Sequence, residues 1–314
     1  MKLSVLIMTY NHAPFIRQAI DSVLMQQTDF DFEVLISEDC STDGTRQIVE
    51  SYHRKHPSRI RLLLSDRNLH SNRIVVRGIQ AARGRYIALL DGDDYWSVSH
   101  KLQKQVDFLE RHPECTVCFH NATVVHEDGR RDPWLWTPPT QPEISTLEDI
   151  WLGNFIATGS TVFRRGAFGD VPDWYISLFP ITDWPLHILN AEHGHIGYIN
   201  EVMGIYRHHG GGLYSAFSQP RKRRETLKFY RTMDRNLNFK YTRLINTAIS
   251  KYFFEWAEEN LARGNPGQAR ACFKTALSGR PVNRFFPLKT LMILAGSVYK
   301  SQFLRRKRPV LKNE

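Results

Sequence analysis

The chain has 314 residues, of which 42% are hydrophobic and 24% charged, and its formal net charge is +10. This length allows one large domain with a smaller appendage, and the ordinary composition excludes a disordered, collagen-like or disulfide-stapled chain. No apolar run reaches the roughly 18 residues of a transmembrane helix. The charge comes without a recognition helix, zinc finger or aromatic RNA-binding signature, so we expect no nucleic-acid partner.

We expect no secretory signal at the N-terminus, because the apolar run Leu3–Met8 is too short and polar residues follow it. Of the four cysteines, Cys115 and Cys118 form a lone CxxC in a strand-like stretch. No further metal ligands lie nearby at suitable spacing, so we interpret both as buried structural thiols. So few cysteines in a chain of this size indicate a reducing compartment, and we expect a cytoplasmic protein.

Strand-like and helix-like segments alternate through the first hundred residues. Continuous apolar runs predict four strands, at Leu3–Met8, Phe32–Ile36, Ile60–Leu64 and Tyr86–Leu90. Between these runs, apolar residues recur at helical spacing. The alternation indicates a parallel sheet flanked by helices, and uninterrupted apolar runs are typical of strands buried on both faces.

The pattern is mixed from about residue 100 to 215. Leu102–Leu109 has helical spacing, and Val117–Val125 and Thr161–Arg164 have the composition of strands. Trp134–Pro142 is an aromatic, proline-rich loop, and the triglycine Gly210-Gly211-Gly212 ends the pattern. We assign residues 1–215 to one α/β domain.

Residues 216–314 form a helical and basic region. Near 250–283 the apolar spacing and the turn Gly264-Asn265-Pro266-Gly267 resemble one tetratricopeptide-like hairpin, which cannot form a solenoid alone. Two basic clusters, Arg221-Lys222-Arg223-Arg224 and Arg305-Arg306-Lys307-Arg308, either suit anionic partners or are solvated charge runs.

The apolar segment Phe285–Tyr299 precedes the second basic cluster. It is too short to span a membrane and has two interpretations: a helix in the interface of an anionic membrane, or a terminal helix packed on the protein. The first interpretation predicts peripheral contact with the inner face of the membrane through the C-terminus.

Polar residues gather where the expected strands end. Thr9-Tyr10-Asn11 follows the first strand, Glu38-Asp39 the second and Asp91-Gly92-Asp93-Asp94 the fourth. In open parallel sheets, ligands bind in the crevice beyond the carboxyl ends of the strands. Clustered carboxylates are costly unless they are paired or bind a cation, although Asp and Gly also favour turns and helix N-caps. Hard oxygen ligands favour Mg²⁺ or Mn²⁺.

The ordered set of motifs resembles glycosyltransferase family 2, the inverting enzymes with a GT-A fold. No glycine-rich phosphate loop follows the first strand, so P-loop and dinucleotide-binding folds lack their main motif. The resemblance covers about residues 3 to 210 and is carried by Ser4–Asn11, Glu38–Thr45, Leu90–Asp94, Thr182-Asp183-Trp184 and Tyr206-Arg207-His208-His209.

The resemblance implies a mostly parallel central sheet flanked by helices, here with a C-terminal helical extension, and a role for each matching residue. Asp183 would be the general base. Asp93 would hold a divalent metal, Mn²⁺ or Mg²⁺, and His209 would contact the metal or the diphosphate. The residues that would bind the nucleotide sugar are Thr9, Tyr10, Asn11, Glu38, Asp39, Arg73, Asp91, Gly92 and Asp93.

Two positions depart from the family pattern. Glu38-Asp39 stands where two aspartates are common, and Val75 stands where an arginine often contacts the diphosphate. Arg73 or Arg77 would have to supply that contact. The Gln-x-x-Arg-Trp motif of processive polysaccharide synthases is absent, so we expect one sugar per encounter.

The expected activity is transfer of a sugar from a nucleoside-diphosphate sugar, with UDP favoured, to a hydroxyl of a glycan or a lipid-linked or lipopolysaccharide acceptor. The alternative is a catalytically inactive nucleotide-sugar-binding scaffold. Asp183 also fits a helix N-cap, and His209 also fits a loop histidine beside flexible glycines. Five aromatic residues are candidates for sugar stacking or for the core: Trp134, Trp136, Trp174, Tyr175 and Trp184.

Overall fold

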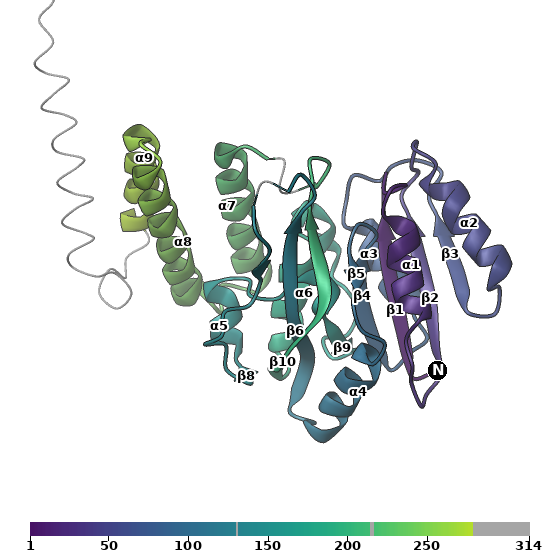
Figure 1. The fold of residues 1–314 in the computed structure, drawn as a ribbon. Coiled ribbons are helices and arrows are strands. Elements are labelled where there is room, and N and C mark those ends of the chain that lie inside the picture. Colours follow the sequence, from purple (N-terminus) through teal and green to yellow (C-terminus); the bar gives the residue numbers. More distant parts are fainter. Residues whose placement is uncertain (130, 214–216, 279–314) are drawn as a thin grey trace, which may run out of the picture. The chain divides into compact units, whose positions relative to one another are not determined.

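The computed structural model describes residues 1–129, 131–213 and 217–278 (Figure 1). These residues belong to two compact units. Of the described residues, unit 1 contains Met1–Ile150 and Asn154–Phe229, and unit 2 contains Trp151–Gly153 and residues 230–278. Among the described residues, no helix combines the length and the apolar character that crossing a membrane requires.

The first half of unit 1 is a parallel sheet with strand order β3-β2-β1-β4, as the alternating pattern predicts. Every residue of β1 and β2 is buried, which explains their uninterrupted apolar runs. Helices connect the strands and flank the sheet (Figure 1). The elements are β1 (Leu3–Thr9), α1 (Ile16–Leu24), β2 (Phe32–Glu38), α2 (Thr45–Lys55), β3 (Ile60–Leu64), α3 (Arg73–Ala81) and β4 (Tyr86–Asp91).

The second half of unit 1 extends the same sheet in the order β4-β9-β6-β10-β5. Strand β9 is antiparallel to both of its neighbours, whereas β6 and β10 are parallel to each other, so the sheet is mixed at this side. The elements are β5 (Tyr95–Trp96), α4 (Lys101–Arg111), β6 (Cys115–His126), β7 (Trp134–Leu135), β8 (Ile144–Ser145), α5 (Leu147–Leu152), the short 3₁₀ helices η1 (Thr158–Ser160) and η2 (Asp173–Leu178), β9 (Val162–Arg164), α6 (Asp183–Ala191) and β10 (His195–His208).

Helix α7 (Gln219–Asn236) runs from unit 1 into unit 2, where α8 (Thr242–Ala262) and α9 (Pro266–Ser278) form a helical hairpin. The turn between α8 and α9 contains Gly264 at φ +74°, a left-handed conformation that favours glycine. The hairpin overlaps the expected region near 250–283 but begins earlier, at Thr242, and residues 279–283 fall outside the described residues. Phe285–Tyr299 and the basic cluster at 305–308 also lie outside them.

The cysteines divide into buried and accessible thiols. Cys115 and Cys118 are fully buried in β6, as expected, and Cys272 is buried in unit 2. Burial raises the pKa of Cys115 to about 11 and that of Cys118 further, so neither is a ready thiolate. Cys40 is partly exposed, just after Asp39, at φ +61°.

Candidate active site

The polar strand ends lie at one edge of the sheet. Thr9, Glu38 and Asp91 are the last residues of β1, β2 and β4, and these strands are parallel. Thr9 pairs with Glu38 in register, and Met8 pairs with Asp91. The structure therefore brings the three sequence clusters together, because backbone pairing fixes their ends beside one another.

Gly92 shapes the turn that follows β4. Its amide donates a hydrogen bond of 2.8 Å to the carbonyl of Met8. A Cβ at this position would lie 2.7 Å from Thr9 Oγ1 and 2.9 Å from His12 Nδ1, closer than such atoms approach in proteins. The turn can therefore pack against β1 only if residue 92 is glycine.

Arg207 ties the same turn to β10. Its amide donates to Asp94 Oδ1 at 2.8 Å, and its Nη1 donates to the carbonyl of Asp93 at 2.7 Å. The guanidinium also pairs with Glu127 at 2.9 Å and lies 4.5 Å from the ring centroid of Tyr95. These contacts fix the main chain of the turn at Asp93 and Asp94 against β10.

Two imidazoles face the Asp93 carboxylate. Oδ2 of Asp93 lies 2.9 Å from Nε2 of His209 and 3.5 Å from Nε2 of His12. Burial alone would raise the pKa of Asp93, but the two rings lower its pKa below the ordinary value. Burial lowers the pKa of His12 and favours its neutral form. Our sequence analysis missed His12, although it stands directly after the strand-end cluster Thr9-Tyr10-Asn11.

The charge of Asp183 also acts on Asp91. Its Oδ2 accepts hydrogen bonds from Thr158 Oγ1 at 3.1 Å and Asn154 Nδ2 at 3.2 Å, and its Oδ1 accepts the Trp184 amide at 2.7 Å. Burial, with the charges of Asp93 and Asp183, raises the pKa of Asp91 well above its ordinary value, while a hydrogen bond from Thr158 opposes that rise. Asp183 is the first residue of α6, so its carboxylate lies at the start of a helix. The same carboxylate interacts electrostatically with Asp91.

The carboxylates at the end of β2 are engaged within the chain. Glu38 is fully buried and pairs with Arg46 through Nε at 2.7 Å and Nη2 at 2.6 Å. Asp39 accepts Ser65 Oγ and the Leu69 amide, each at 3.0 Å. Both residues therefore order the loops around this end of the sheet.

Asn11 joins the loops that follow β1 and β2. It lies in the left-handed region at φ +54°. Its amide donates to Ser41 Oγ at 2.9 Å, and its side-chain carbonyl accepts the Thr42 amide at 2.9 Å. The neighbouring Tyr10 ring is 38% exposed and is available to a ligand at this edge.

The two candidate arginines of α3 have different surroundings. Arg77 donates to Ser65 Oγ at 2.9 Å, Ser37 Oγ at 3.1 Å and the carbonyl of Glu38 at 3.1 Å. Arg73 is exposed at the start of the helix, and Val75 is buried. Arg77 therefore hydrogen-bonds within the protein, whereas the Arg73 side chain is exposed to solvent.

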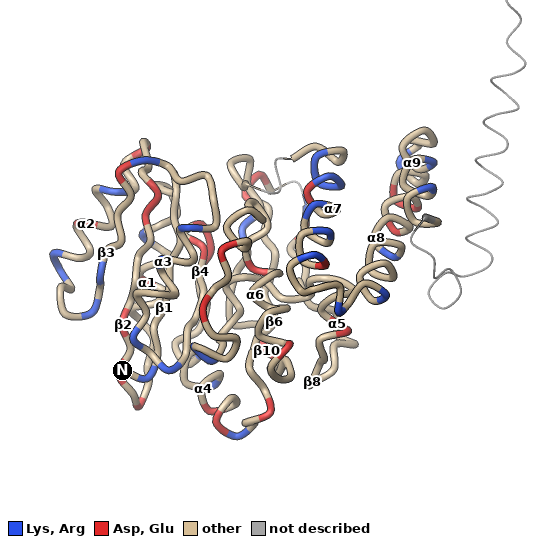
Figure 2. The backbone as a smooth tube through the Cα atoms, turned by 180° about the vertical axis from the view of Figure 1, so that it is seen from behind, with Lys and Arg blue, Asp and Glu red and all other residues tan. Residues whose placement is uncertain are grey.

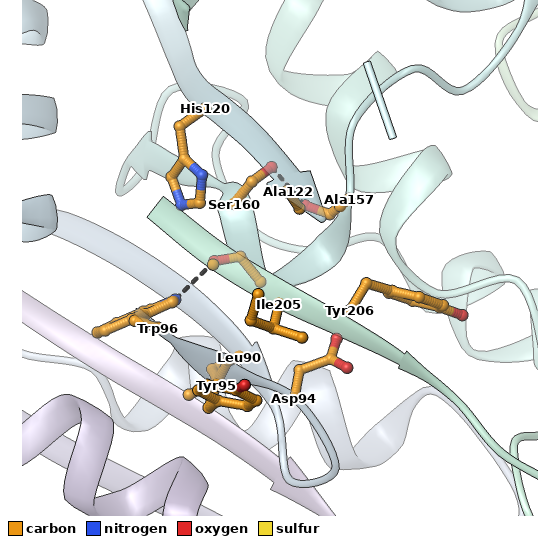
Figure 3. Close-up of a pocket in the computed structure, with 12 residues that line it drawn as sticks. Leu90, Asp94, Tyr95, Trp96, His120, Ala122, Ala157, Ser160, Ile205 and Tyr206 are labelled. Carbon is orange, nitrogen blue, oxygen red and sulfur yellow. Dashed lines mark hydrogen bonds between the residues drawn. The ribbon is translucent and has the colours of Figure 1, made fainter. Parts of the chain in front are cut away.

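A small pocket lies beside the Asp94 turn, and its lining includes Trp96, His120 and Tyr206 (Figure 3). The Tyr206 ring lies 4.9 Å from the ring of Trp136, which is nearly parallel to that of Trp134 at 6.2 Å. Trp134 is 48% exposed, so an aromatic row connects the pocket to the surface. Among the other aromatic candidates, Tyr175 and Trp184 are core residues and Trp174 is half-buried.

Comparisons with known proteins agree with this architecture. The family model "Glycosyl transferase family 2" matches residues 4–171. Uncharacterized protein Rv1520 of Mycobacterium tuberculosis is 35% identical over 284 residues, which cover 89% of this chain and 80% of that protein. The poly(ribitol-phosphate) beta-N-acetylglucosaminyltransferase TarS of Staphylococcus aureus is 31% identical over 150 residues, covering 47% of this chain and 25% of TarS.

Two solved structures share the fold. Residues 1–349 of S. aureus TarS in complex with UDP-GlcNAc match with a TM-score of 0.66 and 20% identity, covering 100% of this chain and 94% of that one. The mannosyltransferase PcManGT of Pyrobaculum calidifontis, with GDP-Man and Mn²⁺, matches with a TM-score of 0.54 and 16% identity, covering 97% and 82%. The expected GT-A fold is confirmed.

Proposed function

Because the chain belongs to glycosyl transferase family 2 and is therefore a glycosyltransferase that uses a nucleotide sugar, we propose that it transfers one sugar, with inversion, to a hydroxyl of a glycan or lipid-linked acceptor. A UDP-sugar is the favoured donor, because the similar TarS structure holds UDP-GlcNAc. Peripheral contact with a cytoplasmic membrane face belongs to the same proposal.

The observation that carries the proposal is the arrangement of three carboxylates at one sheet edge. The charges of Asp183 and Asp93 both act on Asp91, and Asp93 also contacts the imidazoles of His209 and His12. As the acceptor oxygen bonds to the anomeric carbon, its proton passes to Asp183 and the bond to the diphosphate breaks on the opposite face. A positioned base of this kind contributes about 10² to 10⁴ in rate.

The donor set around Asp93 fits a divalent metal. Asp93 supplies a carboxylate oxygen and His209 an imidazole nitrogen 2.9 Å from it. Among the described residues, no group of three or more His, Cys, Asp or Glu side chains is arranged around a metal position, and Asp93 and His209 are hydrogen-bonded to each other. When bound there, the metal would neutralise charge on the diphosphate leaving group.

The nucleotide would lie beside the β1 and β2 loops. Tyr10 offers an exposed ring face next to Asp39, whose carboxylate is held by Ser65 and Leu69. Arg73 would reach the diphosphate in place of the arginine that Val75 replaces. On the acceptor side, Trp134 and Trp136 offer flat apolar faces that suit the C–H faces of a sugar.

Helix α7 supports contact with an anionic membrane. Five of its cations are exposed, and their spacing of three or four residues places them on one face of the helix. Figure 2 shows Lys and Arg along α7. The face comprises Arg221, Arg224, Lys228, Arg231 and Arg235. A row of this kind is attracted to anionic headgroups at about 1 kcal/mol per cation.

A thermal-shift panel of nucleoside diphosphates and their sugars, with and without Mn²⁺, tests the donor. A matching ligand at a hundredfold excess over its Kd should add about 2.7 kcal/mol of stability. Mass spectrometry of acceptor mixtures should then detect one added sugar per acceptor. Binding of the donor without transfer to any acceptor or to water would favour an inactive scaffold instead.

A further inference from the structure

Two imidazole nitrogens point at a single carboxylate oxygen. Nε2 of His209 and Nε2 of His12 lie 2.9 and 3.5 Å from Oδ2 of Asp93. The side chains are 12%, 16% and 16% exposed for His209, His12 and Asp93. The two rings come from opposite ends of unit 1, one after β1 and one after β10. Three side chains that can ligate a metal therefore meet here from separate elements. His12 is the one added to the pair Asp93 and His209.

The distance from each imidazole nitrogen to Oδ2 suits two ligands of one ion. Two ligands about 2.1 Å from a metal and at right angles to each other lie about 3.0 Å apart. The separations of 2.9 and 3.5 Å between the imidazole nitrogens and Oδ2 are therefore close to those of a filled site. A cation would replace the hydrogen bond between His209 and Asp93, and the side chains would move apart around it, because no group of three among the described residues is already spaced around a metal position.

His12 is held in place by the surrounding main chain. Its amide donates to Thr45 Oγ1 at 2.9 Å, and its carbonyl accepts the amides of Phe15 and Ile16 at 2.9 and 2.8 Å, at the start of α1. Its Nδ1 lies 3.4 Å from Thr9 Oγ1. The hydroxyl oxygen can accept a hydrogen bond from Nδ1–H, and in that neutral tautomer Nε2 has a free lone pair for a metal.

We propose that His12 is a third protein ligand of the divalent cation and makes the site prefer Mn²⁺ over Mg²⁺. The inference rests on the proposed metal-assisted transfer. Mg²⁺ retains oxygen ligands and waters, whereas imidazole nitrogen is a softer donor that suits transition metals. With two imidazoles and one carboxylate, the site offers more nitrogen than oxygen. His12 thus sets which metal the transferase uses.

Metal titration of the full chain in the presence of UDP tests this assignment. We expect His12→Gln to weaken Mn²⁺ binding at least about tenfold, since even outer partners of a metal site contribute 10- to 100-fold. Mg²⁺ affinity should change much less, so the ratio of the two affinities falls. His100→Gln, at a half-exposed histidine paired with Glu201, is the control and should change neither.

Pulsed EPR of bound Mn²⁺ separates ligation from a structural effect. Wild type should show two coupled imidazole nitrogens and His12→Gln one. One nitrogen in wild type, or equal losses of Mn²⁺ and Mg²⁺ affinity in the variant, would overturn the role of His12 while leaving the metal in place. Wild type that binds neither metal with UDP would overturn the metal-assisted function as well.

Discussion

The hydroxyl of Thr158 donates a hydrogen bond of 3.1 Å to Oδ2 of Asp183, and the same side chain hydrogen-bonds to Asp91. Thr158 belongs to the short helix η1, which precedes β9. One hydroxyl thus lies between the proposed base and the end of β4. The orientation of the Asp183 carboxylate depends on it and on Asn154.

Replacing Thr158 by valine should reduce turnover by about ten- to a hundredfold, because a hydrogen bond to a charged group is worth about 1.5–3 kcal/mol. Steady-state kinetics should show the loss in kcat, with little change in the donor KM. Thr158→Ser keeps the hydroxyl and should retain most of the activity. Equal activities of the valine and serine variants would contradict the role of this hydroxyl.

Asp183→Asn should retain donor affinity and lose transfer. The amide preserves the size of the side chain but cannot take the acceptor proton, so we expect a rate loss of about 10² to 10⁴. Calorimetric titration with the donor provides the control for folding and binding. Near-normal turnover of this variant would show that another group is the base.

Gly92→Ala tests how closely the turn after β4 packs on β1. The added Cβ would meet Thr9 and His12 at less than 3 Å. The turn must therefore shift, and donor and metal affinity should fall by more than tenfold, equivalent to about 1.4 kcal/mol. Gly267→Ala, where no atom lies within 4 Å of the new Cβ, is the matched control and should behave as wild type.

The sequence predicted the strands of the first half well, because strands buried on both faces leave continuous apolar runs. It placed their ends one or two residues early at Thr9, Glu38 and Asp91, since backbone pairing continues into polar residues. Trp134–Leu135 pairs with β6 although its composition indicated a loop, because strand pairing there depends on distant residues.

In the candidate site, too, the sequence indicates some residues and gives no signal for others. Motif spacing identified Asp93 and His209, which the fold brings to 2.9 Å across 116 positions of sequence. Thr158 and Asn154 carry no comparable signal, because isolated polar residues acquire a role only when tertiary packing brings them to Asp183. His12 directly follows a strand-end cluster, but a single histidine there does not distinguish a ligand from a turn residue.

His187 should make the stability of the protein depend on pH. Burial lowers its pKa from 6.5 to about 4, although Asp183 opposes the shift. Between these values the unfolded chain binds the additional proton, so the free energy of unfolding falls as the pH decreases from 7 to 4, by about 3 kcal/mol. Denaturant titrations of His187→Leu should lack this part of the decrease. If the free energy of unfolding depended on pH in the same way in wild type and His187→Leu, this role of His187 would be contradicted.

Charge reversal on α7 should weaken binding to vesicles that contain anionic lipid. Arg221→Glu together with Arg224→Glu removes two attractive contacts, so affinity should fall by at least about thirtyfold, or 2 kcal/mol. Raising the salt concentration should reduce wild-type binding in the same direction. Arg54→Glu with Lys55→Glu changes the net charge equally, away from this helix; an equal loss for that pair would mean that net charge alone drives binding.

Cys40 is the partly exposed thiol next to Asp39, whereas Cys115, Cys118 and Cys272 are buried. A thiol-reactive dye should therefore attach at one place in the folded chain without any cysteine having to be removed. That place adjoins the loops where the nucleotide is proposed to lie, so the attached fluorophore would report donor occupancy directly. The native sequence thus provides its own optical sensor for screening donors and metals.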